Sequence, residues 1–225
     1  FNLTGNNNSA FGYRSLFGNT TGANNSAFGY KALRYNTTGG QNTAIGHNAL
    51  LNNTIGDGNS AVGHRSLSSN TTGWAYSAFG YQSLYNNTTG SNNVAVGTNA
   101  LFSNNGDDNC AFGYRTLFSN TTGASNSAFG HRPLYSNTIG SSNSAFGRYA
   151  LFYNTTGSNN TAMGRDSLRN NTIGIQNTAV GYESMYNNTT GINNVAVGVG
   201  SLFSNKTGVN NIAVGVTSLY ANTGG

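Results

Sequence analysis

The repeat unit that decides the fold runs from Asn25 to Gln41 and reads Asn-Ser-Ala-Phe-Gly-Tyr-Lys-Ala-Leu-Arg-Tyr-Asn-Thr-Thr-Gly-Gly-Gln. Its Ala-apolar-Gly triplet recurs with a 17-residue period, except for one interval that is shorter by one position. The alanines are residues 10, 27, 44, 61, 78, 95, 111, 128, 145, 162, 179, 196 and 213. The missing residue falls at Asn104-Asn105-Gly106, where other copies read Asn-Thr-Thr-Gly. We interpret residues 1–225 as one tandem-repeat domain of about 13 turns.

The length and composition of the repeat predict its secondary structure. A 17-residue period is too short for two packed helices, and the 32 glycines make the chain too rich in glycine for one helix per repeat. The low charged content of 7% and the single proline also differ from those of disordered tails. The sequence therefore predicts an all-β fold, a parallel β-solenoid (β-roll) whose turns stack at a strand spacing of about 4.8 Å.

Some positions hardly change from copy to copy. The Ala and Gly of the triplet never vary, the following Leu changes once, to Met185, and the Asn of Asn-Thr-Thr-Gly never varies. We expect these side chains to form structural ladders, each lying over its equivalent in the next turn. The first members of these ladders are Ala10, Gly12, Ala27, Gly29, Leu16, Leu33, Asn19, Asn36, Asn53 and Asn70.

The corners and faces of each turn also follow from the pattern. Asn-Thr-Thr-Gly ends in a glycine suited to positive φ and predicts one corner. Pro133 occurs just before Leu134 and predicts a second corner, between Tyr13 and Leu16 and their equivalents. Alternation places Asn, Ala and Gly of the strand on one side and Ser, Phe and Tyr on the other. Because a narrow solenoid has one interior, the second, apolar side predicts a homo-oligomer, most simply a three-fold bundle.

The Asn row allows two interpretations. In the first, it is a buried ladder of side-chain amides. In the second, it is a row of glycosylation sites, for which the acceptor sequence is Asn-x-Thr. Ile55, Ile139 and Ile173 replace that Thr while the Asn is kept, which favours the ladder and predicts that the Thr/Ile position is buried. Glycosylation stays the alternative for the sequons at Asn19, Asn36, Asn70, Asn120 and Asn154.

The triplet and its flanking Asn resemble a known family. Asn-Ser-Ala-Phe-Gly, with variants such as those at 42–46 and 194–198, is similar to the head repeats of trimeric autotransporter adhesins and to repeats in phage tail-fibre-like proteins. The resemblance implies a left-handed β-roll, three chains side by side, and a role in display or attachment. The adhesin repeats are usually shorter and richer in Ala.

Candidates for chemistry are few. Asp107 and Asp108 are adjacent carboxylates in the shortened corner, and we interpret them as solvated. The three histidines share one position with several tyrosines, which predicts a packing column; the alternative is a metal held between His47 and His64. Cys110 has no neighbouring base in any copy. We predict no enzymatic activity, no metal and no cofactor.

Two exposed features are candidates for binding. A basic column is formed at one repeat position by Arg14, Lys31, Arg65, Arg115 and Arg132, and it could contact anionic surface polysaccharide. Its alternative role is solubility and protection against lateral aggregation. Aromatic residues at a second position could stack sugar rings or pack between chains: Phe17, Tyr85, Phe102, Phe118, Tyr135, Phe152, Phe203 and Tyr220.

The remaining features bound the partners and the location. The net charge of +5 is spread along the chain without a block of like charges, so we predict no nucleic-acid partner. No apolar run approaches the length needed for a membrane span, which is about 18 residues or more. Since the chain begins and ends partway through a repeat, we expect a segment of a longer protein.

We predict a structural, non-enzymatic segment of an extracellular, cell-surface or virion-surface fibre or adhesin shaft that self-associates side by side, with end-to-end association as a further mode. The alternative is a carbohydrate-binding or host-surface-binding module.

Overall fold

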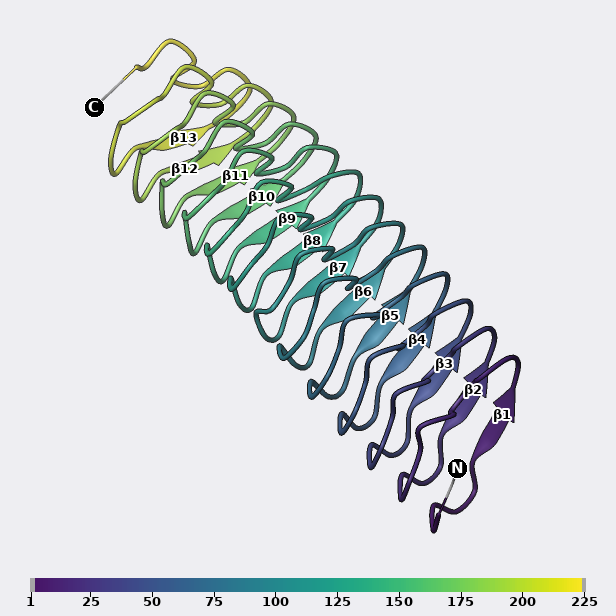
Figure 1. Ribbon diagram of the computed structural model, residues 1–225. Coiled ribbons are helices and arrows are strands. Elements are labelled where there is room, and N and C mark those ends of the chain that lie inside the picture. Colours follow the sequence, from purple (N-terminus) through teal and green to yellow (C-terminus); the bar gives the residue numbers. More distant parts are fainter. Residues whose placement is uncertain (1–2, 224–225) are drawn as a thin grey trace. The chain divides into compact units, whose positions relative to one another are not determined.

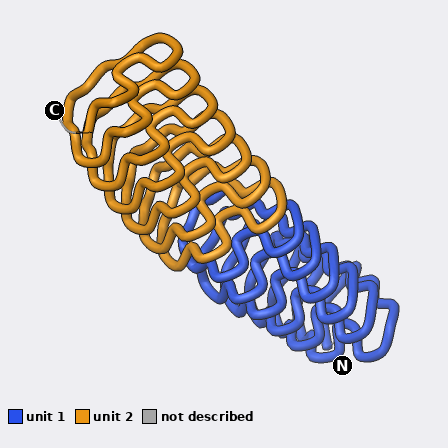
Figure 2. The backbone as a smooth tube through the Cα atoms, turned by 90° about the horizontal axis from the view of Figure 1, so that it is seen from above, with its two compact units in different colours: residues 1–109 blue, residues 110–225 orange. Residues whose placement is uncertain are grey.

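The computed structural model describes residues 3–223 and is a parallel β-solenoid, as predicted from the repeat. Within these residues there is no helix, and each 17-residue turn contributes one three-residue strand (Figure 1). The chain divides into two compact units, residues 1–109 and 110–225, and the boundary follows the shortened turn (Figure 2).

Each unit contains a parallel sheet with its strands in chain order. The first unit contains β1 (Ser9–Phe11), β2 (Ser26–Phe28), β3 (Thr43–Ile45), β4 (Ser60–Val62), β5 (Ser77–Phe79) and β6 (Val94–Val96). The second contains β7 (Cys110–Phe112), β8 (Ser127–Phe129), β9 (Ser144–Phe146), β10 (Thr161–Met163), β11 (Thr178–Val180), β12 (Val195–Val197) and β13 (Ile212–Val214).

The register between neighbouring strands places each residue beside its repeat equivalent. In the first unit Ala10 pairs with Ala27, and in the second Ala162 pairs with Ala179. Outside the strands, bonds such as Leu33 N–H to the Ala49 carbonyl (3.0 Å) continue the same register. One repeat therefore makes one turn, with like side chains over like.

The glycine of the triplet ends each strand. Gly29 has φ +136°, a conformation that L side chains rarely adopt, and a Cβ there would lie 2.5 Å from the Gly46 carbonyl oxygen of the next turn. Both the backbone conformation and the close approach require glycine, which explains why this position never varies.

The corner at Asn-Thr-Thr-Gly differs from the sequence prediction. Its glycines, such as Gly39, are not among the residues with positive φ. Glycine is required there by space, since a Cβ on Gly39 would lie 2.5 Å from the Gly56 carbonyl oxygen and 2.6 Å from Asn36 Oδ1. The left-handed positions are instead taken by side-chain-bearing residues, among them Lys31 (φ 56°) and Leu33 (φ 53°).

The Leu of the repeat is therefore held in a backbone conformation that costs about 1–2 kcal/mol in an L-residue. Leu33 and its equivalents from Leu50 to Leu202 are fully buried, and burying a Leu side chain contributes about 1.5–3 kcal/mol. Burial thus offsets the backbone cost. Sequence inspection did not predict this, because Leu is not a residue typical of left-handed positions.

The interior of each turn is one narrow core made of Ala, Leu and Asn. Ala27, Leu33 and Asn36 are fully buried, while Phe28, on the opposite side of the strand, is 43% exposed. Ala10 in β1 and Gly12 directly after it lie at the edge of the sheet and are exposed.

The Asn side chains connect the turns. Asn36 Nδ2 donates both to Asn19 Oδ1 (2.8 Å) and to the carbonyl of Gly39 (2.8 Å) in its own corner. A second buried Asn column, two residues before the triplet Ala, was not identified as a ladder from the sequence. Its member Asn25 donates to the same Gly39 carbonyl (2.9 Å), and Asn25 Oδ1 accepts from the backbone N–H of Asn42 (3.0 Å). The corner carbonyl of Gly39 therefore accepts hydrogen bonds from two Asn side-chain amides.

The Thr/Ile position of the corner was predicted to be buried, and this prediction is wrong. Ile55, Ile139 and Ile173 are 53%, 54% and 53% exposed. The preceding Thr is half-buried instead, and its hydroxyl donates to the next turn, as in Thr37 Oγ1 to the Thr54 carbonyl (3.0 Å). An isoleucine is tolerated at the outer position because its side chain points into solvent.

The Asn ladder gives a direct stability prediction. Asn137 Nδ2 donates to Asn120 Oδ1 (2.7 Å) and to the Gly140 carbonyl (2.9 Å), and Asn137 Oδ1 accepts from Asn154 (2.8 Å). We expect Asn137→Ala to lower the free energy of unfolding by about 3 kcal/mol or more, because buried partners lose their hydrogen bonds. Urea unfolding measures the change.

The matched control is Asn170→Ser. Asn170 is half-buried and donates one 3.3 Å bond to Asn187, and Ser136 occupies the same repeat position. We expect a change within about 0.5 kcal/mol. Equal destabilisation by the two substitutions would contradict a ladder role for Asn137.

Candidate functional site: the outer aromatic and basic columns

A column of stacked rings lies on the outside of the first unit. It is formed by Tyr13, Tyr30, His47, His64 and Tyr81, whose ring centroids are 4.9–5.3 Å apart with interplanar angles of 9–15°. The strand spacing of about 4.8 Å places like rings at the distance at which aromatic rings stack. These residues form the packing column predicted from the sequence.

The metal alternative for the histidines does not fit this geometry. The His47 and His64 rings are stacked with centroids 5.1 Å apart and planes 14° from parallel. The nitrogen lone pairs of an imidazole lie in the ring plane, so two nearly parallel rings do not direct them at a common point. Residues 3–223 also contain no group of three or more His, Cys, Asp or Glu side chains arranged to hold a metal ion.

The basic column lies beside these rings. Arg14 is exposed, and its guanidinium lies 5.3 Å from the Tyr13 ring centroid and 5.5 Å from that of Phe17. Lys31 Nζ lies 4.7 Å from the Tyr30 ring, and Arg115 lies 5.1 Å from the Tyr114 ring. Contacts of this kind hold a cation against an aromatic face. Lys31, Arg65, Arg115 and Arg132 are half-buried.

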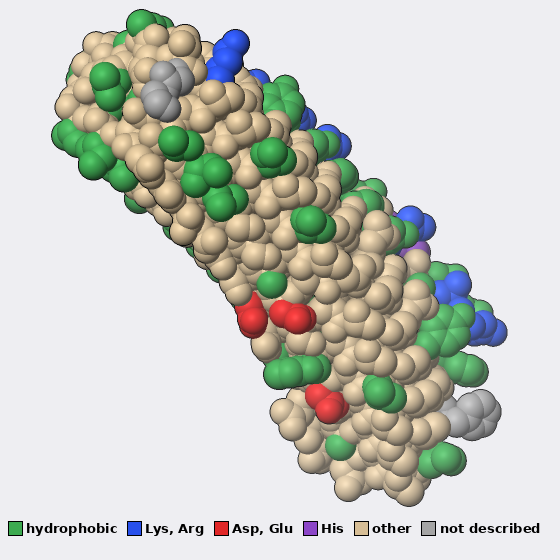
Figure 3. All heavy atoms as spheres, turned by 90° about the vertical axis from the view of Figure 1, so that its left-hand side faces the viewer, with side chains coloured by type: hydrophobic (Ala, Val, Ile, Leu, Met, Phe, Trp, Pro, Cys, Tyr) green, Lys and Arg blue, Asp and Glu red, His purple; other side chains and the backbone are tan. Residues whose placement is uncertain are grey.

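In Figure 3, basic side chains project at the edge of the view and acidic side chains lie on the face toward the viewer. The predicted aromatic residues at the second position stack in the same way. Tyr85 and Phe102 have centroids 5.3 Å apart, and Phe203 and Tyr220 are 4.8 Å apart. The basic side chains therefore lie close to rings on a surface built from repeat positions.

The basic position changes character further along the second unit. Asp166 occupies it and is buried, with its carboxylate bonded to Arg165 Nε (3.0 Å) and to Arg169 Nη1 (3.1 Å). Two arginines at neighbouring positions therefore pair with one carboxylate. In this part of the chain, Arg165 and Arg169 form ion pairs with a side chain of the protein itself.

The sequons lie inside the protein. Asn19, Asn36, Asn70, Asn120 and Asn154 are all fully buried. The Asn36 and Asn154 amides donate to neighbouring ladder and corner oxygens. A glycan on any of these amide nitrogens does not fit the folded turn, so this geometry is incompatible with the glycosylation alternative.

The other two candidates for chemistry, Asp107 and Cys110, lie in surroundings that give them a structural role. Asp107 Oδ1 accepts from the backbone N–H of Ser91 (2.7 Å) and so caps the corner of the previous turn. Cys110 is half-buried in β7, and burial raises the pKa of its thiol, which disfavours the nucleophilic thiolate. Neither residue is arranged as an acid, base or nucleophile.

Tyr76 is an internal departure from the repeat that sequence inspection missed. It stands where every other turn has the second Asn, and its ring is almost fully buried. Its hydroxyl accepts a hydrogen bond from Asn87 Nδ2, which therefore does not reach Asn70 Oδ1, and that oxygen has no hydrogen-bond partner. The signal was present in the sequence as a single aromatic residue in an otherwise constant Asn column.

Comparison of the chain with protein-family models and with curated proteins finds no match. Between residues 3 and 223, no helix has the length and apolarity needed to span a membrane.

Tyr76 predicts an alkaline limit to stability. Burial raises the pKa of Tyr76 far above its usual value, while the unfolded chain keeps a pKa of about 10. Above pH about 10 the phenol ionises in the unfolded chain but stays protonated in the folded one, which favours unfolding. The free energy of unfolding is therefore unaffected by the titration of this group below pH about 10 and falls by up to about 1.4 kcal/mol per pH unit above it. Urea unfolding at about pH 8 and about pH 11 measures this slope.

We expect Tyr76→Asn, which restores the repeat residue, to flatten that alkaline slope. Tyr85→Phe is the control, since Tyr85 lies on the outer surface and Phe102 occupies its position in the next turn. An alkaline slope unchanged in Tyr76→Asn would rule out this role for the buried phenol.

Proposed function

We propose that the chain is a structural, non-enzymatic segment of an extracellular fibre or adhesin shaft displayed on a cell or virion surface. The observation that carries this proposal is the in-register pairing of consecutive turns, in which Ala, Leu and Asn recur at equivalent positions. An architecture whose turns are nearly identical supplies length and stiffness, since each turn adds the same contacts as the last.

Stiffness follows from the hydrogen bonds between turns. Backbone bonds such as Leu33 N–H to the Ala49 carbonyl (3.0 Å) act together with side-chain bonds such as Asn53 Nδ2 to Asn36 Oδ1 (2.8 Å). Bending a unit requires these bonds to lengthen on one side of many turns at once. This property suits a shaft or spacer.

The outer side of the strands supports self-association. Phe112, Phe129 and Phe146 stack with centroids 5.0 and 4.9 Å apart, and Phe112 and Phe146 remain 36% and 37% exposed. A contiguous exposed apolar row is typical of an interaction surface. We propose that other copies of this chain cover it, side by side as a homotrimer in the way the adhesin-like repeat implies, with end-to-end association as a further mode.

The trimer predicts a mass three times the 23.4 kDa of the chain in sedimentation equilibrium. We expect the double substitution Phe129→Ser and Phe146→Ser to weaken association at least ten-fold, because it removes the apolar row. Phe118→Ser is compared with it, because it removes a ring from the other outer aromatic position, and equal weakening would place that position in the interface as well. A concentration-independent monomer, or a two-fold axis in cryo-EM images, would contradict the trimer.

A second candidate function is binding of anionic surface polysaccharide by the basic column. It is favoured by the contacts that hold Arg14, Lys31 and Arg115 beside aromatic rings, because ordered cations lose less conformational freedom on binding.

We expect binding of a sulfated polysaccharide to fall at least ten-fold in the triple variant Arg14→Ser, Arg65→Ser, Arg115→Ser, and to weaken with salt. Among single variants, Arg65→Ser is compared with Lys206→Thr, which removes one positive charge and restores the Thr of that repeat position. Equal losses in these two single variants would mean that only net charge matters. Surface plasmon resonance measures the affinities.

A further inference from the structure

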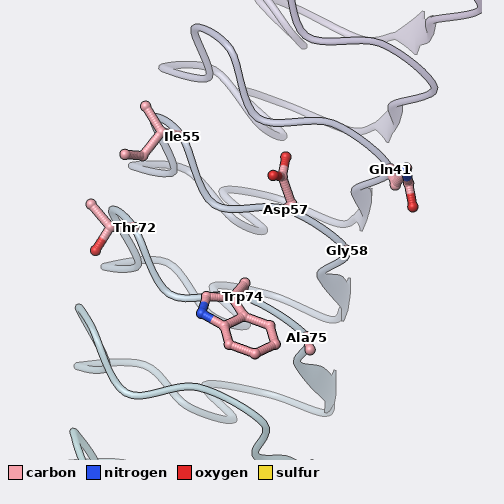
Figure 4. A pocket seen from close by; sticks show the side chains of 7 residues that line it. All are labelled: Gln41, Ile55, Asp57, Gly58, Thr72, Trp74 and Ala75. Carbon is pink, nitrogen blue, oxygen red and sulfur yellow. The ribbon is translucent and has the colours of Figure 1, made fainter.

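A surface groove of about 330 Å³ lies on the first unit, at the corners of consecutive turns. Gln41, Ile55, Asp57, Gly58, Thr72 and Trp74 line it (Figure 4). Figure 4 shows the Asp57 carboxylate on one turn and the Trp74 indole on the next. Trp74 and Gly58 occur in no other turn at their positions, whereas Ile55 recurs as Ile139 and Ile173.

Trp74 has no evident structural role for its size. It is the one tryptophan of the chain, 53% of it is exposed, and it stacks on no other ring among residues 3–223. The position accepts residues from Gly40 and Ser91 to Ile175 in other turns, and none of them is aromatic. The Trp74 indole therefore presents an open aromatic face against which a ligand ring can pack.

Asp57 is held in place beside this platform. Its Oδ1 accepts a short 2.6 Å hydrogen bond from the backbone N–H of Gly40, which fixes the carboxylate at the surface. The second oxygen retains its capacity to accept hydrogen bonds. Gly58 opens the wall of the groove, because a Cβ there would meet nothing within 4 Å, whereas Asn24 and Asn92 place side chains at this position.

We propose that this groove binds one ring of a neutral saccharide. The indole stacks on the C–H face of the pyranose, and the Asp57 carboxylate and the Gln41 amide bond to its hydroxyl groups. A volume of about 330 Å³ is at the lower end of the range for small-molecule sites and suits a single sugar ring. The carboxylate disfavours anionic sugars, so this ligand differs from that of the basic column.

The single aromatic wall also distinguishes a sugar from a quaternary ammonium ion. Such ions are recognised by cages of several rings, and the residues lining this groove include only one. The proposal uses none of the residues that carry the fibre or the basic column, so it stands or falls independently of the proposed function.

The single tryptophan makes the test direct, because its emission, excited selectively over the 13 tyrosines, reports on this groove. The full chain is titrated with glucose, galactose, mannose and N-acetylglucosamine up to about 100 mM, since one sugar ring is expected to bind with a Kd of about 1 mM or weaker. We expect at least one of them to shift the Trp74 emission saturably.

Two variants test the geometry with residues that other turns already contain. Asp57→Ser and Gly58→Asn match Ser91 and Asn92 in their positions, so both are compatible with the fold. We expect each to weaken the fluorescence response at least ten-fold, and Ser141→Ala, at the Trp74 position in the second unit, to leave it unchanged.

Trp74→Ser is followed by saturation-transfer NMR of the sugar, and we expect loss of the signal. The proposal is overturned if none of the four sugars changes the emission, if both groove variants respond like the parent chain, or if tetramethylammonium alone produces the response.

Discussion

The parallel hydrogen bonding between neighbouring turns is the constraint on which the rest of the structure depends. At this spacing a Cβ on Gly29 would clash with the Gly46 carbonyl oxygen, at 2.5 Å. The residue that ends each strand therefore has to be glycine. The interior is equally narrow and accepts Ala, Leu and Asn. Asn is suited to it because one amide closes its own corner and reaches the next turn, as Asn36 does with Gly39 and Asn19. The Asn36 amide is thereby hydrogen-bonded inside a thin core.

The same register organises the outer surface. Because each turn repeats the last, an outward side chain meets its own equivalent, and rings such as Tyr30 and His47 stack 4.9 Å apart. Basic residues at the next position then contact these rings. The surface is therefore a set of columns, and replacing one residue alters one row of a column while leaving the backbone in place. This separation allows a constant interior to support varied surfaces.

Several departures from the repeat lie close together in the first unit. Tyr76 enters the interior and displaces one ladder bond, Trp74 two residues earlier faces solvent, and the shortened corner at Asn104–Gly106 follows two turns later. Asp57 caps the backbone of Gly40 one turn before Trp74. A regular solenoid presents equivalent surfaces along its length, so a site that binds one ligand at one place has to arise from such departures.

From the sequence alone, the constant repeat spacing determined the parallel solenoid, the in-register turns and the small interior, because only stacking of like on like explains positions that never vary. Tertiary structure decided what periodicity does not encode. It placed Leu33 at positive φ, because burial offsets a backbone cost that sequence patterns do not reveal, and it turned Ile55 outward. It also brought Asp57, Gly58 and Trp74 together in one groove, since residues a whole turn apart become neighbours only when the turns stack.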